Sequence, residues 1–163
     1  MPKSIVFCAD GTWNGPGESD SDDPRAPWSN VFKLFLSLAG SDAPDTVRLA
    51  KEQERTLLAA DGYPAQVAKY LHGVGDSDNL LVRLIGGAFG AGLITRIVRG
   101  YTFVSRNYVA GDRIYLIGFS RGAYTARALA GLISAKGLLT PATVDPADKA
   151  AAYRAGAAVW FQW

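Results

Sequence analysis

One stretch restricts the fold of this chain more than any other: LIGFSRGAY, residues 116–124. An apolar run precedes it, a helix-forming run follows it, and Ser120 stands between two glycines in the pattern G-x-S-x-G. Glycines are needed where a strand reverses tightly into a helix, because side chains at those positions would clash. The spacing therefore predicts a strand at Arg113–Gly118, a strained turn at Ser120 and a helix over residues 121–135.

Strands and helices alternate along the rest of the chain as well. Continuous apolar runs bounded by turn residues predict strands, and apolar residues at three- and four-residue spacing predict helices. The further strands that we expect are Ser4–Ala9 and residues 65–71, and the further helices are residues 30–38, 46–60 and 93–108. Residues 14–29, rich in Gly, Pro, Ser and Asp, predict a loop. This alternation predicts an α/β fold, with a parallel sheet and helices on both of its faces.

Composition narrows the class of protein. With 163 residues, of which 48% are hydrophobic and 20% charged, the chain is expected to form a single domain over residues 1–163. Basic and acidic residues are interspersed, with a net charge of +2 and no block of basic residues. The sequence therefore predicts no nucleic-acid-binding surface. The one cysteine, Cys8, lies in an apolar run and predicts a reducing compartment. Neither a signal peptide nor a membrane-spanning segment is predicted, so we expect a cytoplasmic protein.

The ends of the three predicted strands carry polar residues. Ligands of parallel α/β sheets bind at the carboxyl ends of the strands, and these ends lead into Asp10-Gly11-Thr12, His72-Gly73 and Ser120. We therefore expect these segments at one edge of the sheet. In a plainer interpretation, Ser120 only caps a helix, while the Asp10 and Thr12 side chains hold a tight turn.

Ser120 fits a serine nucleophile at a strand-to-helix elbow. The amide of Arg121, at the positive end of the following helix, would donate to an oxyanion, and the backbone of Gly11 and Thr12 would supply the second donor. Such a serine needs a base, and the only histidine, His72, precedes it in the chain. His72 is either that base or, as is more common for a histidine in a turn, a surface residue.

Two other kinds of chemistry are weighed. Asp10-Gly11-Thr12 after a first strand is similar to the D-x-D-G-T motif of haloacid-dehalogenase-type phosphatases, but Cys8 occupies the position of the nucleophilic aspartate, and a thiol does not replace a magnesium-bound carboxylate. The acidic segments 20–23 and 76–79 lack the spacing of a calcium loop, and the glycines of residues 86–92 are out of register with a dinucleotide fingerprint. No metal or cofactor is predicted.

The motifs together resemble a known family. D-G-T-W-N at residues 10–14, G-V-G at 73–75, G-D-R-I-Y at 111–115 and G-F-S-R-G-A-Y at 118–124 occur in the order found in the α/β-hydrolase domain of type VI secretion phospholipase effectors. The resemblance extends from about residue 5 to residue 137. It implies a Ser-Asp-His lipase or esterase that cleaves acyl esters of glycerophospholipids, with Ser120 as the nucleophile and Asp10, Gly11 and Thr12 in the first-strand motif.

The resemblance also implies that two members of the triad are absent. In the family the catalytic aspartate follows a further strand and the histidine comes later, so neither falls within this sequence, and Asp145 and Asp148 do not take the acid role. We therefore expect the N-terminal part of the hydrolase fold, whose serine alone has ordinary alcohol reactivity. The alternative is an inactive fragment or decoy that binds an immunity protein or the secretion apparatus. Effectors of this kind are exported without a signal peptide.

Overall fold

The computed structural model describes residues 1–11, 28–42, 52–73, 89–140, 142, 144–145 and 148–163, and only the backbone of residues 89–91. These residues form one five-stranded sheet of order β2-β3-β4-β1-β5. The strands are β1 (Ser4–Ala9), β2 (Ser41–Asp42), β3 (Glu52–Leu58), β4 (Pro64–Leu71) and β5 (Arg113–Gly118). The helices are α1 (Asn30–Ser37), α3 (Phe89–Asn107), α4 (Arg121–Lys136) and α5 (Lys149–Phe161).

Three neighbouring strands of the sheet, β4, β1 and β5, are parallel, with β1 between the other two. β1 pairs with β4 on one side and with β5 on the other, so that Ala9 lies opposite both Leu71 and Gly118. The strands predicted at Ser4–Ala9 and Arg113–Gly118 are confirmed residue for residue, and the one predicted from residue 65 begins at Pro64. The carboxyl ends of β4, β1 and β5 therefore lie side by side.

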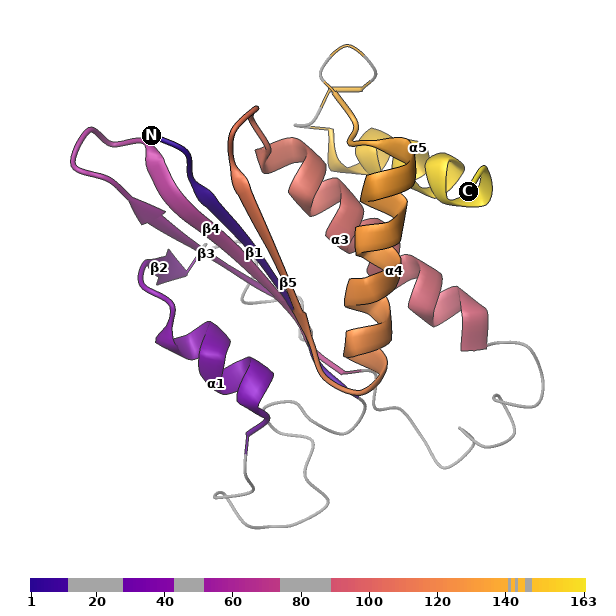
Figure 1. Cartoon of the computed structure of the whole chain (residues 1–163), viewed down its shortest axis with the longest axis horizontal. Helices are drawn as coiled ribbons and strands as arrows, with labels where there is room; N and C mark the ends of the chain where they lie inside the picture. Colours follow the sequence, from indigo (N-terminus) through magenta and orange to yellow (C-terminus); the bar gives the residue numbers. More distant parts are fainter. Residues whose placement is uncertain (12–27, 43–51, 74–88, 141, 143, 146–147) are drawn as a thin grey trace.

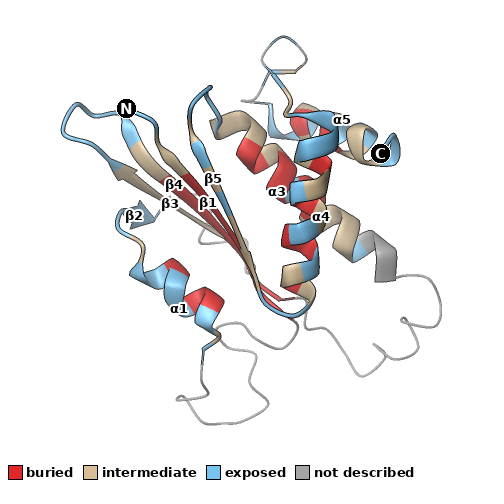
Figure 2. Ribbon diagram, in the orientation of Figure 1, coloured by how far each residue is buried: buried red, intermediate tan, exposed pale blue. Residues whose placement is uncertain are grey.

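Helices cover both faces of the sheet, as the alternation predicted. α1 lies against one face, and α3, α4 and α5 lie on the other (Figure 1). The side chains of β1 alternate between the two layers: Ile5, Phe7 and Ala9 pack on the α3 and α4 side, whereas Val6 and Cys8 pack on the α1 side. Every residue of β1 except Ser4 is buried, which is the pattern of a central parallel strand (Figure 2).

The sheet is mixed, and one predicted helix is wrong. Residues 52–58, expected to be helical, form β3, which runs antiparallel to β4 and pairs with β2. Glu52 and Glu54 bond to side chains of α3, while Arg55 donates to carbonyl groups at the end of α1, including that of Leu38 at 3.0 Å. In a strand, alternate side chains point to opposite faces, so this segment can reach hydrogen-bonding partners on both faces of the sheet. These interactions outweigh the helix propensity of a Glu- and Arg-rich segment.

A buried network of charges joins β3 and β4 to α3. Lys69 on β4 lies 2.7 Å from a carboxylate oxygen of Glu52 and 3.0 Å from one of Glu54. Arg99 and Arg106 of α3 pair with the same two carboxylates. Burial alone would raise the pKa of Glu54, but Lys69 and Arg106 together hold it below its ordinary value of 4.5. The charged form therefore stabilises the fold above that pH, and this contribution is lost as the pH falls through the lowered pKa.

α1, α3 and α4 differ from the predicted helices mainly at their ends, whereas α5 was not predicted. α3 begins at Phe89, four residues before the predicted start at residue 93. α4 runs one residue further than predicted and ends before Gly137, whose φ of 71° suits glycine. Asp148 caps α5 by accepting from the amides of Ala150 and Ala151. None of the helices in the described ranges is both long and apolar enough to cross a bilayer.

Replacing Lys69 with Met should destabilise the fold strongly. The change leaves two buried carboxylates without their shared cation, so we expect a loss of about 3–5 kcal/mol. Arg99→Met is the matched control, because the Arg99 side chain is 48% exposed and Glu52 keeps Lys69, and its cost should stay within about 1 kcal/mol. Urea denaturation of both variants measures the difference. Equal losses would contradict a stabilising role for the network.

Candidate functional site

Ser120 has a strained backbone. Its φ of 54° and ψ of −123° place it in the left-handed half of conformational space, where it is the only non-glycine residue among those that the structure describes. It sits directly before α4, yet its side chain makes no capping hydrogen bond to that helix. Ser120 therefore occupies the N-cap position of α4 without the side-chain hydrogen bond of a capping serine. A residue in such a conformation costs about 1–3 kcal/mol and is typical of functional turns.

Glycines allow the turn around Ser120 to pack on the end of β1. A Cβ atom on Gly122 would lie 2.0 Å from the carbonyl oxygen of Ala9, and one on Gly118 would lie 2.2 Å from the carbonyl oxygen of Gly122. A Cβ on Gly11 would lie 2.9 Å from Cβ of Ser120. The backbone after β1 and the turn between β5 and α4 are thus in direct contact, and these three positions have no room for a side chain.

The expected edge of the sheet is present. Asp10, His72 and Ser120 follow β1, β4 and β5, whose parallel register brings their ends together. In Figure 1 the turn between β5 and α4 lies beside the end of β1. Thr12, the other residue proposed for this edge, lies outside the described residues, as do the acidic segments 20–23 and 76–79.

The Asp10 side chain is buried and joins neighbouring segments by hydrogen bonds. It is 1% exposed, and its carboxylate accepts hydrogen bonds from the amide of Gly11 (2.9 Å), the hydroxyl of Tyr70 (2.8 Å) and the hydroxyl of Ser29. Ser29 also accepts from the amide of Phe32 at 3.0 Å, and so caps α1. Burial and the nearby Asp10 charge raise the pKa of Tyr70, so its hydroxyl keeps its proton and donates. Asp10 therefore ties the start of α1 and the end of β4 to the end of β1.

Arg96 is a site residue that the sequence analysis missed. Its guanidinium on α3 donates to the carbonyl oxygens of Asp10 (2.9 Å), Leu71 (3.4 Å) and His72, which lie at the ends of β1 and β4. Burial lowers the pKa of Arg96, although the nearby Tyr70 and Asp10 groups oppose this shift. The only sign of this role in the sequence is that Arg96 is a charged residue among apolar ones in the predicted helix. By itself, that pattern indicates no more than an interrupted apolar segment.

The structure corrects one interpretation of His72 and weakens the phosphatase hypothesis. His72 is 6% exposed, not a surface residue, and its Nδ1 donates to the carbonyl of Gly73 at 2.8 Å. Cys8 is fully buried on the α1 side of β1, and burial, with a smaller effect of Asp10, raises the pKa of its thiol to about 12. A nucleophile must reach its substrate as the thiolate, and Cys8 is neither accessible nor ionised. In the described ranges, no three His, Cys, Asp or Glu side chains gather as metal ligands would.

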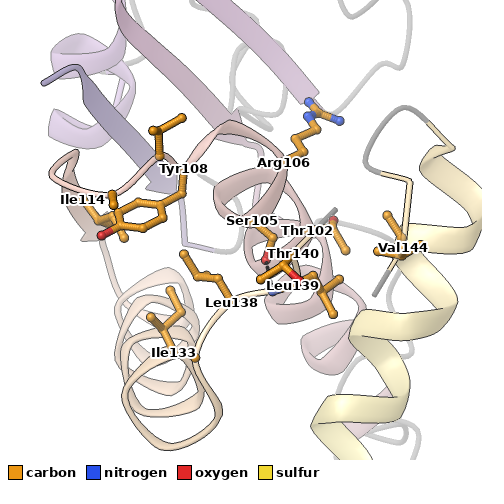
Figure 3. A pocket seen from close by; sticks show the side chains of 14 residues that line it. Thr102, Ser105, Arg106, Tyr108, Ile114, Ile133, Leu138, Leu139, Thr140 and Val144 are labelled. Atoms are coloured by element: carbon orange, nitrogen blue, oxygen red, sulfur yellow. Dashed lines mark hydrogen bonds between the residues drawn. The ribbon is translucent and has the colours of Figure 1, made fainter. Parts of the chain in front are cut away.

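A cavity of about 680 Å³ lies away from Ser120 (Figure 3). Its lining is mainly apolar and includes Tyr108 after α3, Ile114 near the start of β5, and Ile133 near the end of α4. Ser120 precedes α4, whereas Ile133 lies thirteen residues later, a separation of about 20 Å along the helix. The cavity is therefore at the opposite end of the sheet from the candidate site and takes no part in it.

Comparison with known proteins identifies the family. A family model described as "T6SS, Phospholipase effector Tle1-like, catalytic domain" matches residues 3–158. The chain belongs to this family. The resemblance found in the sequence motifs is thereby confirmed, and the match covers nearly the whole chain.

One relative and one negative result complete the comparison. The chain is 32% identical over 140 residues to "Uncharacterized protein YEL023C" of Saccharomyces cerevisiae (strain ATCC 204508 / S288c), a match that covers 85% of this chain. The chain spans only 18% of the length of that relative. No solved structure matched the chain.

Gly122→Ala should disrupt the packing of α4 on β1. The new methyl group would overlap the carbonyl oxygen of Ala9, so the helix must move, and we expect a loss of more than about 4 kcal/mol in the free energy of unfolding. Gly131→Ala in the same helix meets only the ring of Trp163, at 3.0 Å, and should change stability by no more than about 1 kcal/mol. Thermal unfolding compares them. A well-folded Gly122→Ala variant would show that the close approach is not required.

Proposed function

We propose that this chain is the serine-bearing part of a carboxylic ester hydrolase, with Ser120 as its nucleophile. The observation that carries the proposal is the strained, uncapped Ser120 between β5 and α4. In the proposed reaction, Oγ of Ser120 attacks the ester carbonyl carbon and loses its proton to a base. The resulting tetrahedral intermediate expels the alcohol, and water then hydrolyses the acyl-serine.

The oxyanion of that intermediate would be held by backbone amides. Arg121 is the first residue of α4, where amides point towards the helix end and the helix dipole favours negative charge. The amide of Gly11 already donates to Asp10 Oδ1 at 2.9 Å. Of the Gly11-Thr12 pair, we therefore propose the Thr12 amide as the second donor.

The base and the acid of the triad are proposed to come from other parts of a longer protein. His72 is the chain's only histidine, and it is buried with its Nδ1 bonded to Gly73. Asp10 is buried among three hydrogen-bond donors, and Asp148 caps α5. We therefore propose that none of these groups serves Ser120 as base or acid. A relative several times longer than the matched region is consistent with further segments that complete the site.

The family description guides the choice of substrate. It names a phospholipase effector, so we propose the acyl ester of a phospholipid as the substrate class. It also names the type VI secretion system, so we propose export by that route and, for an exported effector, an immunity protein as the partner. Because a yeast protein is 32% identical to the chain over 140 residues, the main proposal concerns the ester chemistry rather than the route of export.

A fluorophosphonate probe tests the nucleophile. In the longer protein that we propose, with its base and acid present, we expect a covalent adduct on wild-type Ser120, located by peptide mass spectrometry, because an activated serine attacks phosphorus as it attacks a carbonyl. The 163-residue chain alone should react several orders of magnitude more slowly, because in this proposal both groups lie outside it. Ser120→Ala should abolish the adduct. Ser134→Ala, which removes an exposed serine of the same helix, should leave it unchanged. If the wild type forms no adduct, or if Ser120→Ala still forms it, the proposal is wrong.

A non-enzymatic binding role is the second candidate. In the part of the sheet that the structure describes, β5 pairs only with β1, and the side chains of Tyr115 on β5 and of Phe119 directly after it are exposed. An open apolar edge favours association with another chain. Dimeric elution of the chain in size-exclusion chromatography, together with no adduct on Ser120 in the longer protein, would favour this candidate over the hydrolase.

A further inference from the structure

We propose that Phe119 and Tyr124 are specificity-determining residues, whose exposed rings beside Ser120 bind a hydrocarbon chain of the ester. This inference rests on the proposed function, because it requires an ester to react at Ser120. The exposure of the two residues does not depend on that function: Phe119 is 51% exposed and Tyr124 is 61% exposed.

The Phe119 ring lies next to the serine. A Cβ atom on Gly11 would lie 2.9 Å from Cβ of Ser120 and 3.1 Å from Cδ1 of Phe119, so both side chains border the same point. The Phe119 backbone is bonded on both sides: its N–H donates to the carbonyl of Ala9 at 3.1 Å, and its carbonyl accepts from the amide of Gly122 at 2.8 Å. The ring is therefore supported by Gly11 on one side, and the rest of it faces solvent beside Ser120.

Tyr124 lies one helical turn after Ser120. Its amide donates to the carbonyl of Ser120 at 3.3 Å, which is the hydrogen bond between residues four apart in a helix. Residues at this spacing share a face of the helix, and helical side chains lean towards the amino end. The Tyr124 ring therefore extends towards the turn that contains Ser120, which is itself exposed.

An ester that reacts at Ser120 has to lie against this surface. Its carbonyl carbon must come within about 3–3.5 Å of Oγ, and the groups attached to that carbon then extend over the neighbouring side chains. Exposed aromatic rings offer a large apolar contact area. No Asp or Glu occurs in residues 113–144, so β5, the turn and α4 bring no carboxylate to this surface. These features fit a hydrocarbon chain better than a charged substituent.

The effect of such a surface can be measured as a dependence on chain length. Single exposed aromatic residues are common on proteins, but these two lie beside the proposed nucleophile. A methylene group that is fully removed from water favours binding about fourfold, and one that is covered on a single side about twofold. Four additional methylene groups should therefore favour the longer ester by about tenfold or more. The chain can belong to the acyl part or to the alcohol part of the ester.

The first test measures chain-length selectivity in the longer protein that we propose. One pair of substrates, para-nitrophenyl butanoate and octanoate, differs in the acyl part, and a second pair, butyl and octyl acetate, differs in the alcohol part. In at least one pair we expect kcat/KM of the wild type to favour the longer chain about tenfold or more. In the double variant Phe119→Ala/Tyr124→Ala this ratio should fall below about threefold. The ratio is the readout because a change that only perturbs Ser120 lowers both rates alike.

Tyr63→Ala is the matched control for this ratio. Tyr63 is a tyrosine with 73% exposure that directly precedes β4, at the amino end of the strand and thus at the opposite end of the sheet from Ser120. Its replacement should leave the ratio within about twofold of the wild type. Loss of selectivity in one pair supports the inference and identifies the part of the ester that carries the chain. A wild type without selectivity in either pair, or a double variant that keeps the wild-type ratio, overturns the inference.

The second test does not need activity. The 163-residue chain with Ser120→Ala is irradiated with methyl decanoate that carries a diazirine at the end of its chain, and tandem mass spectrometry locates the cross-linked residues. We expect cross-links at Phe119 and Tyr124, reduced about tenfold when both are alanine and unchanged in Tyr63→Ala. Cross-links found only in the lining of the distant apolar cavity, such as residues 138–139, overturn the inference.

The two tests distinguish this inference from the proposed function. If the fluorophosphonate forms no adduct on Ser120 in the longer protein, the proposed function fails, and cross-linking alone decides whether the rings bind a hydrocarbon chain. An adduct with unchanged selectivity in the double variant overturns the inference and leaves the proposed function intact. If the double variant does not fold, the exposed single change Tyr124→Ala decides: a loss of selectivity of about threefold or more supports the inference, and a smaller one overturns it.

Discussion

The burial of β1 between two parallel neighbours is the constraint on which the rest of the structure depends. Helices pack on both faces of β1, and β1 pairs with β4 and β5 along its whole length. Its carboxyl end is therefore the place where elements distant in sequence must meet. The turn of Ser120 can pack on that end only because Gly122 has no side chain to strike the carbonyl of Ala9.

Buried charge is used in two different ways in this fold. Between β3, β4 and α3, acids and bases alternate, and each carboxylate has more than one cation beside it. At the site, Asp10 instead receives neutral donors, while the cation Arg96 contacts backbone carbonyls. The first arrangement fixes how a helix lies on the sheet. The second fixes the path of the backbone at the strand ends, and a function that relies on backbone amides needs that kind of control.

The elements that follow local rules could be predicted from the sequence, whereas those set by distant partners could not. β1, β5 and α4 are encoded by continuous apolar runs and by glycines around Ser120, and all three were predicted within about a residue. β3 was missed because its Glu and Arg residues favour a helix by local propensity. The charged side chains and carbonyl groups that stabilise it as a strand come from distant parts of the chain. Arg96 was missed for a related reason: it donates to the carbonyl groups of Asp10, Leu71 and His72, which are more than twenty residues away in the sequence. The chemical role of Ser120 stays a prediction.

The position of Ser120 at the start of α4 has a consequence for any negative charge that forms beside it. The positive end of a helix stabilises a nearby anion by about 0.3–1 kcal/mol at an exposed site. An energy of that size changes an equilibrium by about fivefold at most. The helix can therefore help to hold an anion at this edge of the sheet, but it is far too weak to ionise an alcohol at neutral pH. For the function proposed above, the orientation of the serine and the removal of its proton are thus separate requirements, and the turn before α4 bears only on the first.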